Sequence, residues 1–282
     1  MSRYPALFDR LKANNEGAFV PFVMLGDPNP QDSEEIIEAL IAGGADALEL
    51  GVPFSDPVAD GITIQEAHLR ALAANVSVDD ALAVVKNIRA KHPDLPIGLL
   101  IYGNVAFARG LEQFYADVAA AGADSVLIPD VPVREGEEFI AAAEAAGVDP
   151  IFIAPPHASA ETLEGVAAHS RGYIYAVSRV GVTGADRASE TDGLADVVAH
   201  INQFGGAPAL LGFGISTPQH VRDAIAAGAA GAISGSAVTK IVENACVKQS
   251  EDPADHSATI ADLEALKKAL TDFVAEMKAA TK

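Results

Sequence analysis

Apolar runs alternate with amphipathic segments along most of the chain. Residues 33–42, SEEIIEALIA, place isoleucine and leucine at helical spacing and stop at a Gly-Gly pair, which predicts a helix. Residues 45–51, ADALELG, then alternate with the period of a strand. The same succession, from an alanine-rich helix end through glycine into an apolar strand, recurs along the chain. It predicts a parallel sheet covered by helices.

The pattern predicts eight strands, at residues 19–25, 45–51, 96–102, 125–129, 150–154, 172–177, 209–213 and 231–234. Eight units, with no GxGxxG after the first strand, favour a closed (β/α)8 TIM barrel over an open doubly wound sheet. We therefore expect one α/β domain over residues 1–282, with an extra N-terminal helix and additional helices at 65–74, 78–91 and 260–277. Residues 247–256 are expected to form a solvated loop.

Composition restricts the partners. Half of the 282 residues are hydrophobic, which suffices for a large core, and the formal net charge is −20. So acidic a surface repels nucleic acid and anionic membranes. No apolar run is long enough to span a membrane, Asp9 and Lys12 stand where a signal peptide needs its apolar region, and the single Cys246 excludes an internal disulfide. We expect a cytoplasmic protein with no nucleic-acid or membrane partner.

Two carboxylates flank the loop after the second predicted strand. If Leu48 and Leu50 face the helices, Glu49 points into the barrel near the carboxyl end of its strand. The loop GVPFSDPVADG carries Asp60 at its far end, just before a helix-like segment. An ion-paired or solvent-reaching acid is the alternative for Glu49, and an N-cap or an Asp-Gly turn is the alternative for Asp60.

The carboxyl ends of the other strands complete the expected site, because barrel active sites lie there. Candidate side chains at these ends are Tyr102, Asn104, Asp130, Tyr175 and Ser178. Glycines in residues 212–214 and 234–237 precede helices, an arrangement that lets backbone amides hold phosphate, although tight turns alone would also explain them. The long loop after the sixth strand, with Gly181 and Gly184, is typical of a lid.

Several chemistries are disfavoured. No lysine ends a predicted strand, which argues against a Schiff-base enzyme. His157 is the only histidine near a strand end and is interpreted as a loop residue, and no cluster has metal-ligand spacing, so no metal is expected. Carboxylate acid/base chemistry on a phosphorylated small molecule remains. The residues alone do not specify the reaction.

The motif LELGVPFSDPVADG, with FVPFVMLGDP before it and SRVGVTGA, GFGIS and AGAISGSA after it, closely resembles the tryptophan synthase alpha chain family. The resemblance runs from about residue 3 to residue 243 and resumes at FVAEMKAA. It implies a lyase of L-tryptophan biosynthesis that cleaves indole-3-glycerol phosphate to indole and glyceraldehyde 3-phosphate. It also implies an α2β2 heterotetramer in which the beta chain receives indole and carries pyridoxal phosphate, while the alpha chain needs no cofactor.

The resemblance also implies roles for individual residues. Glu49 would be the general acid/base, and Asp60 would accept the indole N–H. Thr183 would contact Asp60 when the lid closes. The substrate pocket would be lined by Phe22, Leu100, Tyr102, Leu127, Tyr175, Thr183 and Phe213, and the phosphate held by Gly184, Gly214, Gly235 and Ser236.

The chain departs from the family pattern at three places. Ile62 replaces a proline that commonly follows the ADG triplet, the lid tip around Arg187 is weakly matched, and the segment CVKQSEDPADHSAT is longer and more acidic than expected. Two alternatives stay open. One is another phosphosugar barrel enzyme, such as an isomerase, and the other is a regulatory subunit that binds the phosphate ligand without turnover.

Overall fold

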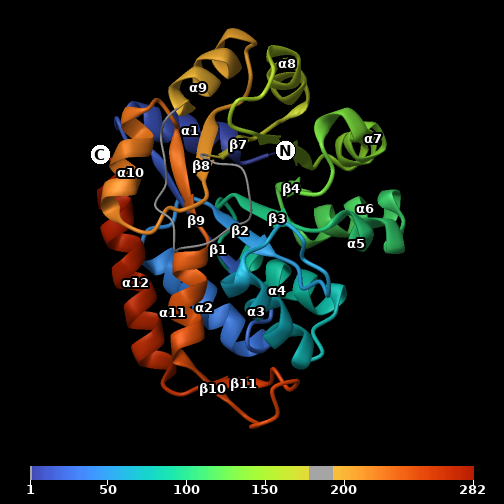
Figure 1. Cartoon of the computed structure of the whole chain (residues 1–282), viewed down its shortest axis with the longest axis vertical. Coiled ribbons are helices and arrows are strands. Elements are labelled where there is room, and N and C mark those ends of the chain that lie inside the picture. The colour runs from blue at the N-terminus through green and yellow to red at the C-terminus, as the bar shows by residue number, and fades with distance from the viewer. Residues whose placement is uncertain (1, 178–192) are drawn as a thin grey trace.

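A parallel barrel surrounded by helices forms the centre of the computed structural model, which describes residues 2–177 and 193–282 (Figure 1). The hydrogen-bonded order is β5-β4-β3-β2-β1-β9-β8-β7-β6. β5 and β6 are consecutive segments on either side of Phe152, so the order closes on itself and the nine segments make the eight strands of a barrel. The predicted (β/α)8 barrel is confirmed. Its strands are β1 (Ala18–Met24), β2 (Leu48–Gly51), β3 (Ile97–Leu100), β4 (Ser125–Leu127), β5 (Asp149–Ile151), β6 (Ile153–Ala154), β7 (Ile174–Val177), β8 (Ala209–Gly212) and β9 (Gly231–Ser234).

Helices cover the outside of this barrel and close one end of it. Among the described residues, none of the helices is both long and apolar enough to cross a membrane. They are α1 (Tyr4–Ala13), α2 (Pro30–Ala42), α3 (Ile62–Ala73), α4 (Val78–Lys91), α5 (Gly103–Arg109), α6 (Leu111–Ala121), the 3-10 helix η1 (Val133–Glu135), α7 (Glu137–Ala146), α8 (Ala160–His169), α9 (Leu194–Gln203), α10 (Pro218–Ala226), α11 (Ser236–Ala245) and α12 (Leu263–Ala279).

The C-terminal part of the chain corrects one prediction. Residues 249–256 form the expected loop, but residues 247 and 248 belong to a strand, because β10 (Cys246–Lys248) pairs antiparallel with β11 (Ala258–Ile260), with Val247 opposite Thr259. The pairing joins β-branched residues that are well separated in sequence, so local polarity did not reveal it. The final helix starts at Leu263 rather than at residue 260, because Asp262 caps it by accepting a hydrogen bond from the Ala265 N–H.

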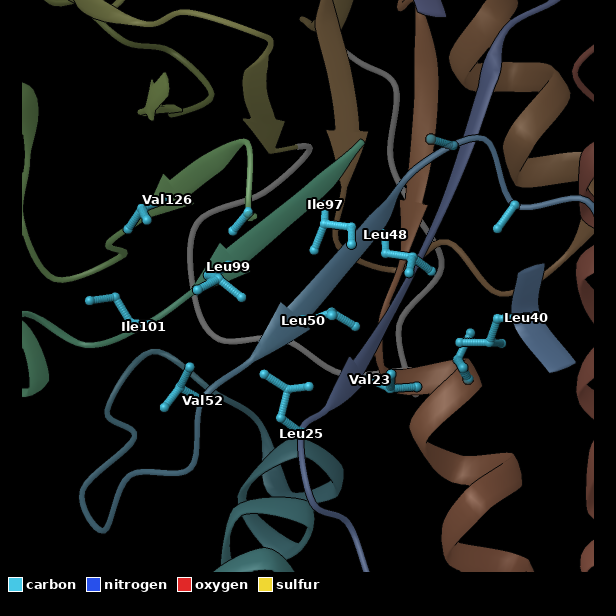
Figure 2. Close-up of a cluster of buried hydrophobic side chains, with 14 of the residues drawn as sticks. Val23, Leu25, Leu40, Leu48, Leu50, Val52, Ile97, Leu99, Ile101 and Val126 are labelled. Atoms are coloured by element: carbon cyan, nitrogen blue, oxygen red, sulfur yellow. The ribbon is translucent and has the colours of Figure 1, made fainter. Parts of the chain in front are cut away.

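The barrel strands divide their side chains between two apolar clusters, as their alternation requires. Leu48 and Leu50 belong to the outer cluster, which also contains Leu40 of α2 (Figure 2). Leu127, Tyr173 and other inward residues belong to the inner cluster. The prediction that Leu48 and Leu50 face the helices and send Glu49 inward is confirmed.

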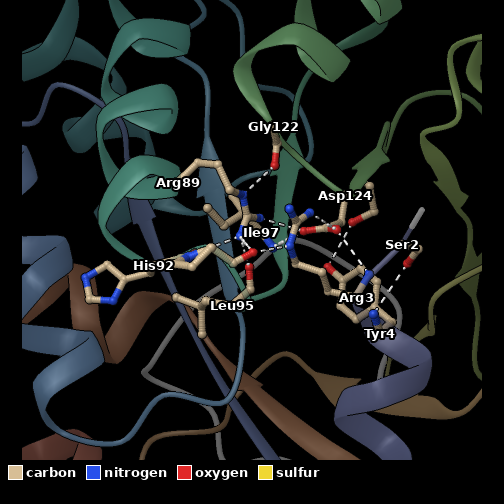
Figure 3. A network of polar contacts seen from close by, with 11 residues as sticks. Ser2, Arg3, Tyr4, Arg89, His92, Leu95, Ile97, Gly122 and Asp124 are labelled. Carbon is tan, nitrogen blue, oxygen red and sulfur yellow. Dashed lines mark hydrogen bonds and ion pairs between the residues drawn. The ribbon is translucent and has the colours of Figure 1, made fainter.

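Helix α1 closes the amino end of the barrel. Its Tyr4, Leu7 and Leu11 are buried in the inner cluster, and the Tyr4 hydroxyl lies 2.9 Å from Ser125 Oγ. Asp124 fixes the start of the helix by accepting hydrogen bonds from Arg3 Nη1 at 2.9 Å and from Arg89 Nη2 at 2.8 Å (Figure 3). With this end filled, a ligand must enter the barrel from the opposite, carboxyl end.

A buried ion pair fastens α3 to the turn after β1. Arg70 Nε donates to Asp27 Oδ1 at 2.7 Å, and Arg70 Nη2 donates to Asp27 Oδ2 at 2.8 Å, with both residues buried. Removing one partner leaves the other charge buried and unpaired. We expect Arg70→Leu to lower the free energy of unfolding by about 3–5 kcal/mol, measured by urea denaturation. The double variant Asp27→Leu/Arg70→Leu should recover most of the loss, and a single variant as stable as the wild type would contradict this role.

Candidate active site

A cavity opens at the carboxyl end of the barrel, and the cavity with its mouth encloses about 460 Å³. Both predicted acids, Glu49 and Asp60, contribute to its wall. The mixture of apolar walls with few polar groups is typical of a small-molecule site. The cavity is lined by Phe22, Glu49, Asp60, Ile64, Leu100, Tyr175, Phe213, Gly214, Ile215, Ile233, Gly235, Ser236 and Ala237.

Glu49 lies on β2 between Phe22 of β1 and Gly98 of β3, and only 2% of its surface is exposed. The Tyr173 O–H donates to Glu49 Oε1 at 2.8 Å. Burial raises the pKa of Glu49 to about 7; the Tyr173 hydrogen bond opposes this rise and the negative charge of Asp60 adds to it. Glu49 has no ion-pair partner among the described residues, so it can exchange a proton near neutral pH.

Asp60 is held by groups from two other elements. Tyr102 O–H donates to Asp60 Oδ2 at 2.7 Å, and the Tyr102 oxygen itself accepts from the Ala59 N–H at 3.1 Å. His68 Nε2 lies 3.3 Å from the same Asp60 oxygen. Gly61, and not Asp60, is the N-cap of α3, so the N-cap alternative for Asp60 is wrong. Asp60 is a buried carboxylate on the cavity wall.

The other side of the cavity is built from backbone. Phe213 and Gly214 have φ angles of 68° and 74°, so two successive residues adopt the left-handed conformation after β8. That conformation costs a non-glycine residue about 1–3 kcal/mol, and such strain is common at ligand sites. Helix α11 starts at Ser236 with no side-chain cap, whereas the Thr217 side chain caps α10. The amino end of α11 therefore presents backbone N–H groups suited to an anion.

Comparison with known proteins decides the family. The family model for the tryptophan synthase alpha chain matches residues 8–272. The tryptophan synthase alpha chains of Corynebacterium efficiens and Corynebacterium diphtheriae are each 63% identical over 282 residues, covering 100% of this chain and 99% and 100% of the relatives. The chain belongs to the tryptophan synthase alpha chain family.

Solved structures agree with this family membership. A structure of Mycobacterium tuberculosis tryptophan synthase matches with a TM-score of 0.84 and 29% identity over 99% of this chain and 98% of that one. The tryptophan synthase subunit alpha of Legionella pneumophila matches equally, with a TM-score of 0.84 and 29% identity over 100% and 98%. As a tryptophan synthase alpha chain, the protein is a lyase of tryptophan biosynthesis that cleaves indole-3-glycerol phosphate, and its family implies a beta chain partner.

The structure brings together most of the residues expected for a tryptophan synthase alpha chain. Phe22, Leu100, Tyr175 and Phe213 line the cavity with the two acids, as do Gly214, Gly235 and Ser236. Leu127 instead lies in the inner cluster, and Tyr102 lies behind Asp60. Thr183, Gly184 and Arg187, together with Ser178 and Gly181, lie outside the described residues.

Other candidates from the sequence have roles away from the cavity. Asp130 Oδ1 accepts from the Gly103 N–H at 2.9 Å and so shapes the turn into α5. His157 is an exposed loop residue with a φ of 59°, which fits its interpretation as a loop histidine. No group of three or more His, Cys, Asp or Glu residues suited to a metal ion is found in the part of the chain that the structure describes.

Tyr173 is a residue of the site that sequence reasoning missed. It lies just before β7 and reaches Glu49 from the inner cluster, two positions before Tyr175. Tyr173 does not stand at the carboxyl end of a strand, where candidate site residues are expected. The two-residue period of a strand nevertheless places it on the same face as Tyr175. Ile64, Ile215 and Ile233 were also missed, because nothing in their local sequence separates a cavity-lining isoleucine from a core one.

The Tyr173 hydrogen bond yields a pH prediction. Its O–H stabilises the Glu49 carboxylate, so Tyr173→Phe should raise the pKa of Glu49 further above 7. The limb of the pH profile of kcat/KM that belongs to Glu49 should move to higher pH by about one unit. Rates of indole release, measured over about two pH units on each side of the midpoint of this limb in both proteins, test the shift. The control is Tyr115→Phe, which alters a tyrosine of the outer cluster. If the limb stays at the same pH in Tyr173→Phe, the Tyr173 hydroxyl does not influence the pKa of Glu49.

Proposed function

We propose that Glu49 and Asp60 carry out the cleavage of indole-3-glycerol phosphate. The observation that carries this proposal is a buried carboxyl group with a pKa of about 7 that shares the wall of one cavity with a second buried carboxyl group. The indole ring lies among Phe22, Leu100, Tyr175 and Phe213, with Thr183 completing the pocket, while Leu127 packs in the inner cluster and Tyr102 holds Asp60. The phosphate is held by Gly184, Gly214, Gly235 and Ser236. The uncapped start of α11 and the sharp turn at Gly214 support this placement of the phosphate.

The proposed reaction begins with Glu49 protonated. Asp60 accepts the indole N–H, and Glu49 transfers its proton to indole C3, so that positive charge develops on the ring beside the Asp60 carboxylate. The Glu49 carboxylate then takes the proton of the C3′ hydroxyl. The bond between C3 and C3′ breaks, its electron pair returns to the ring, and the C3′ oxygen becomes the aldehyde oxygen of glyceraldehyde 3-phosphate. Glu49 ends protonated, as it began.

We further propose that the chain works in the cytoplasm within an α2β2 heterotetramer, and that it has no cofactor of its own. The beta chain would receive the indole and carry pyridoxal phosphate. Exposed apolar side chains support a partner surface at the mouth of the barrel. Val58, Ile62 and Phe107, from the segments after β2 and β3, are 74%, 78% and 53% exposed.

An assay of the purified chain with indole-3-glycerol phosphate, alone and with a beta chain, tests the proposed function. Release of indole and glyceraldehyde 3-phosphate in equal amounts is the expected result. A phosphosugar isomerase would convert its substrate without releasing indole. A regulatory subunit would bind the substrate and activate its partner without turnover. Either of these results would overturn the proposal.

A further inference from the structure

His68 of α3 is a buried imidazole next to the site, and it does not line the cavity. Its exposed fraction is 1%, and its Nδ1 accepts a hydrogen bond from the Phe54 N–H at 3.0 Å. A ring nitrogen that accepts a hydrogen bond carries no proton. The imidazole is therefore neutral, with its proton on Nε2.

That proton points at Asp60. His68 Nε2 lies 3.3 Å from Asp60 Oδ2, so His68 is the donor and Asp60 the acceptor. Tyr102 donates to the same oxygen at 2.7 Å. Both side-chain hydrogen bonds that Asp60 makes with described residues thus fall on Oδ2, an arrangement that leaves Oδ1 for a ligand N–H.

His68 also joins this carboxylate to the loop between β2 and α3. Phe54, whose N–H binds His68, stacks on the Tyr102 ring with centroids 5.2 Å apart. The His68 and Tyr102 rings are 6.2 Å apart. The three rings pack together, and none of them lines the cavity.

We propose that His68 is a positioning residue for the cleavage reaction, which orients the Asp60 carboxylate and ties it to the backbone at Phe54. The inference rests on the proposed role of Asp60. Its physical basis is that a hydrogen bond to a carboxylate in a buried site fixes the orientation of the acceptor. The neutral Nε2–H tautomer is essential, since only it satisfies Phe54 and Asp60 together.

Two substitutions separate the two hydrogen bonds of the imidazole. His68→Asn places an oxygen near the Nδ1 position and can still accept from Phe54, but it has no donor that reaches Asp60. His68→Gln places its amide near the Nε2 position and can still donate to Asp60. We expect kcat/KM for indole release to fall about tenfold in His68→Asn and to stay within about threefold of wild type in His68→Gln. The control His92→Asn alters another carboxylate-bonded histidine, which pairs with Glu38 and ends α4, and should leave kcat/KM unchanged.

A double-mutant cycle distinguishes positioning from general support of the fold. Affinity for a non-cleavable substrate analogue that lacks the C3′ hydroxyl is measured for wild type, His68→Asn, Asp60→Asn and the double variant. If His68 acts through Asp60, His68→Asn should weaken binding in the wild type but have little further effect in Asp60→Asn. Equal losses in both backgrounds would overturn the inference. So would a loss in His68→Gln as large as that in His68→Asn, a comparison that still applies if His68→Asn proves too unstable to purify.

Failure of the proposed function gives a different pattern. Asp60→Asn alone would then bind the analogue and release indole as the wild type does. If only the inference about His68 is wrong, Asp60→Asn still loses activity, and the loss of analogue affinity caused by His68→Asn is the same with and without Asp60→Asn. The two outcomes can be told apart within the same set of variants.

Discussion

Glu49→Gln is expected to lower kcat for indole release by about 10³-fold, within the range that general acid/base groups contribute. Glutamine keeps the size of the side chain and can still accept the Tyr173 hydrogen bond through its amide oxygen. It cannot supply a proton to indole C3 or take one from the C3′ hydroxyl. Binding of the substrate, which depends on the apolar walls and the phosphate end of the cavity, should change little.

Steady-state kinetics of the purified variant measure this loss. KM should stay within a few fold of the wild type, and the limb of the pH profile that belongs to Glu49, near pH 7, should disappear. Since burial is the main cause of the raised pKa, removing the charge should not destabilise the fold, and urea denaturation provides the control. Turnover within tenfold of wild type would show that Glu49 does not transfer the proton.

The second large effect is expected for Asp60→Asn, with kcat/KM falling about 10²-fold, as for the loss of one group that stabilises developing charge. The amide oxygen of asparagine can still accept from Tyr102 and His68. What is lost is the negative charge that balances the positive charge on the protonated indole ring, together with the second oxygen, which accepts the indole N–H. Because that charge develops mainly in the transition state, kcat should fall more than affinity.

Asp56→Asn is the matched control for this variant. Asp56 lies in the same loop but is exposed and does not line the cavity, so the isolated chain should keep its activity. Comparable losses in Asp56→Asn and Asp60→Asn would indicate that the loop, and not the Asp60 carboxylate, is sensitive to substitution. If the kinetics of Asp60→Asn equal those of the wild type, the Asp60 carboxylate has no role in the reaction.

The barrel could be predicted from the sequence because the signals that mark its strands and helices lie within short segments of the chain. Strand alternation at Leu48 and Leu50 sufficed to send Glu49 inward, and glycine stops separated helices from strands. The hairpin of β10 and β11 could not be seen in this way, because its pairing joins residues across a polar segment. Helix α3 begins at Ile62, earlier than the apolar spacing alone suggested.

The site was predictable to the extent that its residues stand at strand ends or in family motifs. Glu49, Asp60 and the glycines near β8 and β9 met that condition. Tyr173 and His68 did not, because each acts through a contact between elements that are far apart in the chain or on different sides of a loop. Leu127 shows the reverse case, since a residue on an inward face can be packed in the core without reaching the cavity.

The closing seam of the barrel has a consequence for synthesis of the chain. β1 pairs with β9, and Ala18 lies opposite Gly231, so the two partners are 213 positions apart in the chain (231 − 18). While a nascent chain leaves the ribosome, one edge of β1 stays without its partner until almost the whole barrel has emerged. An unpaired strand edge invites association with other chains. Truncation before Gly231 should therefore yield a species that aggregates during translation and recruits chaperones, and closure of the seam should be a late event in folding.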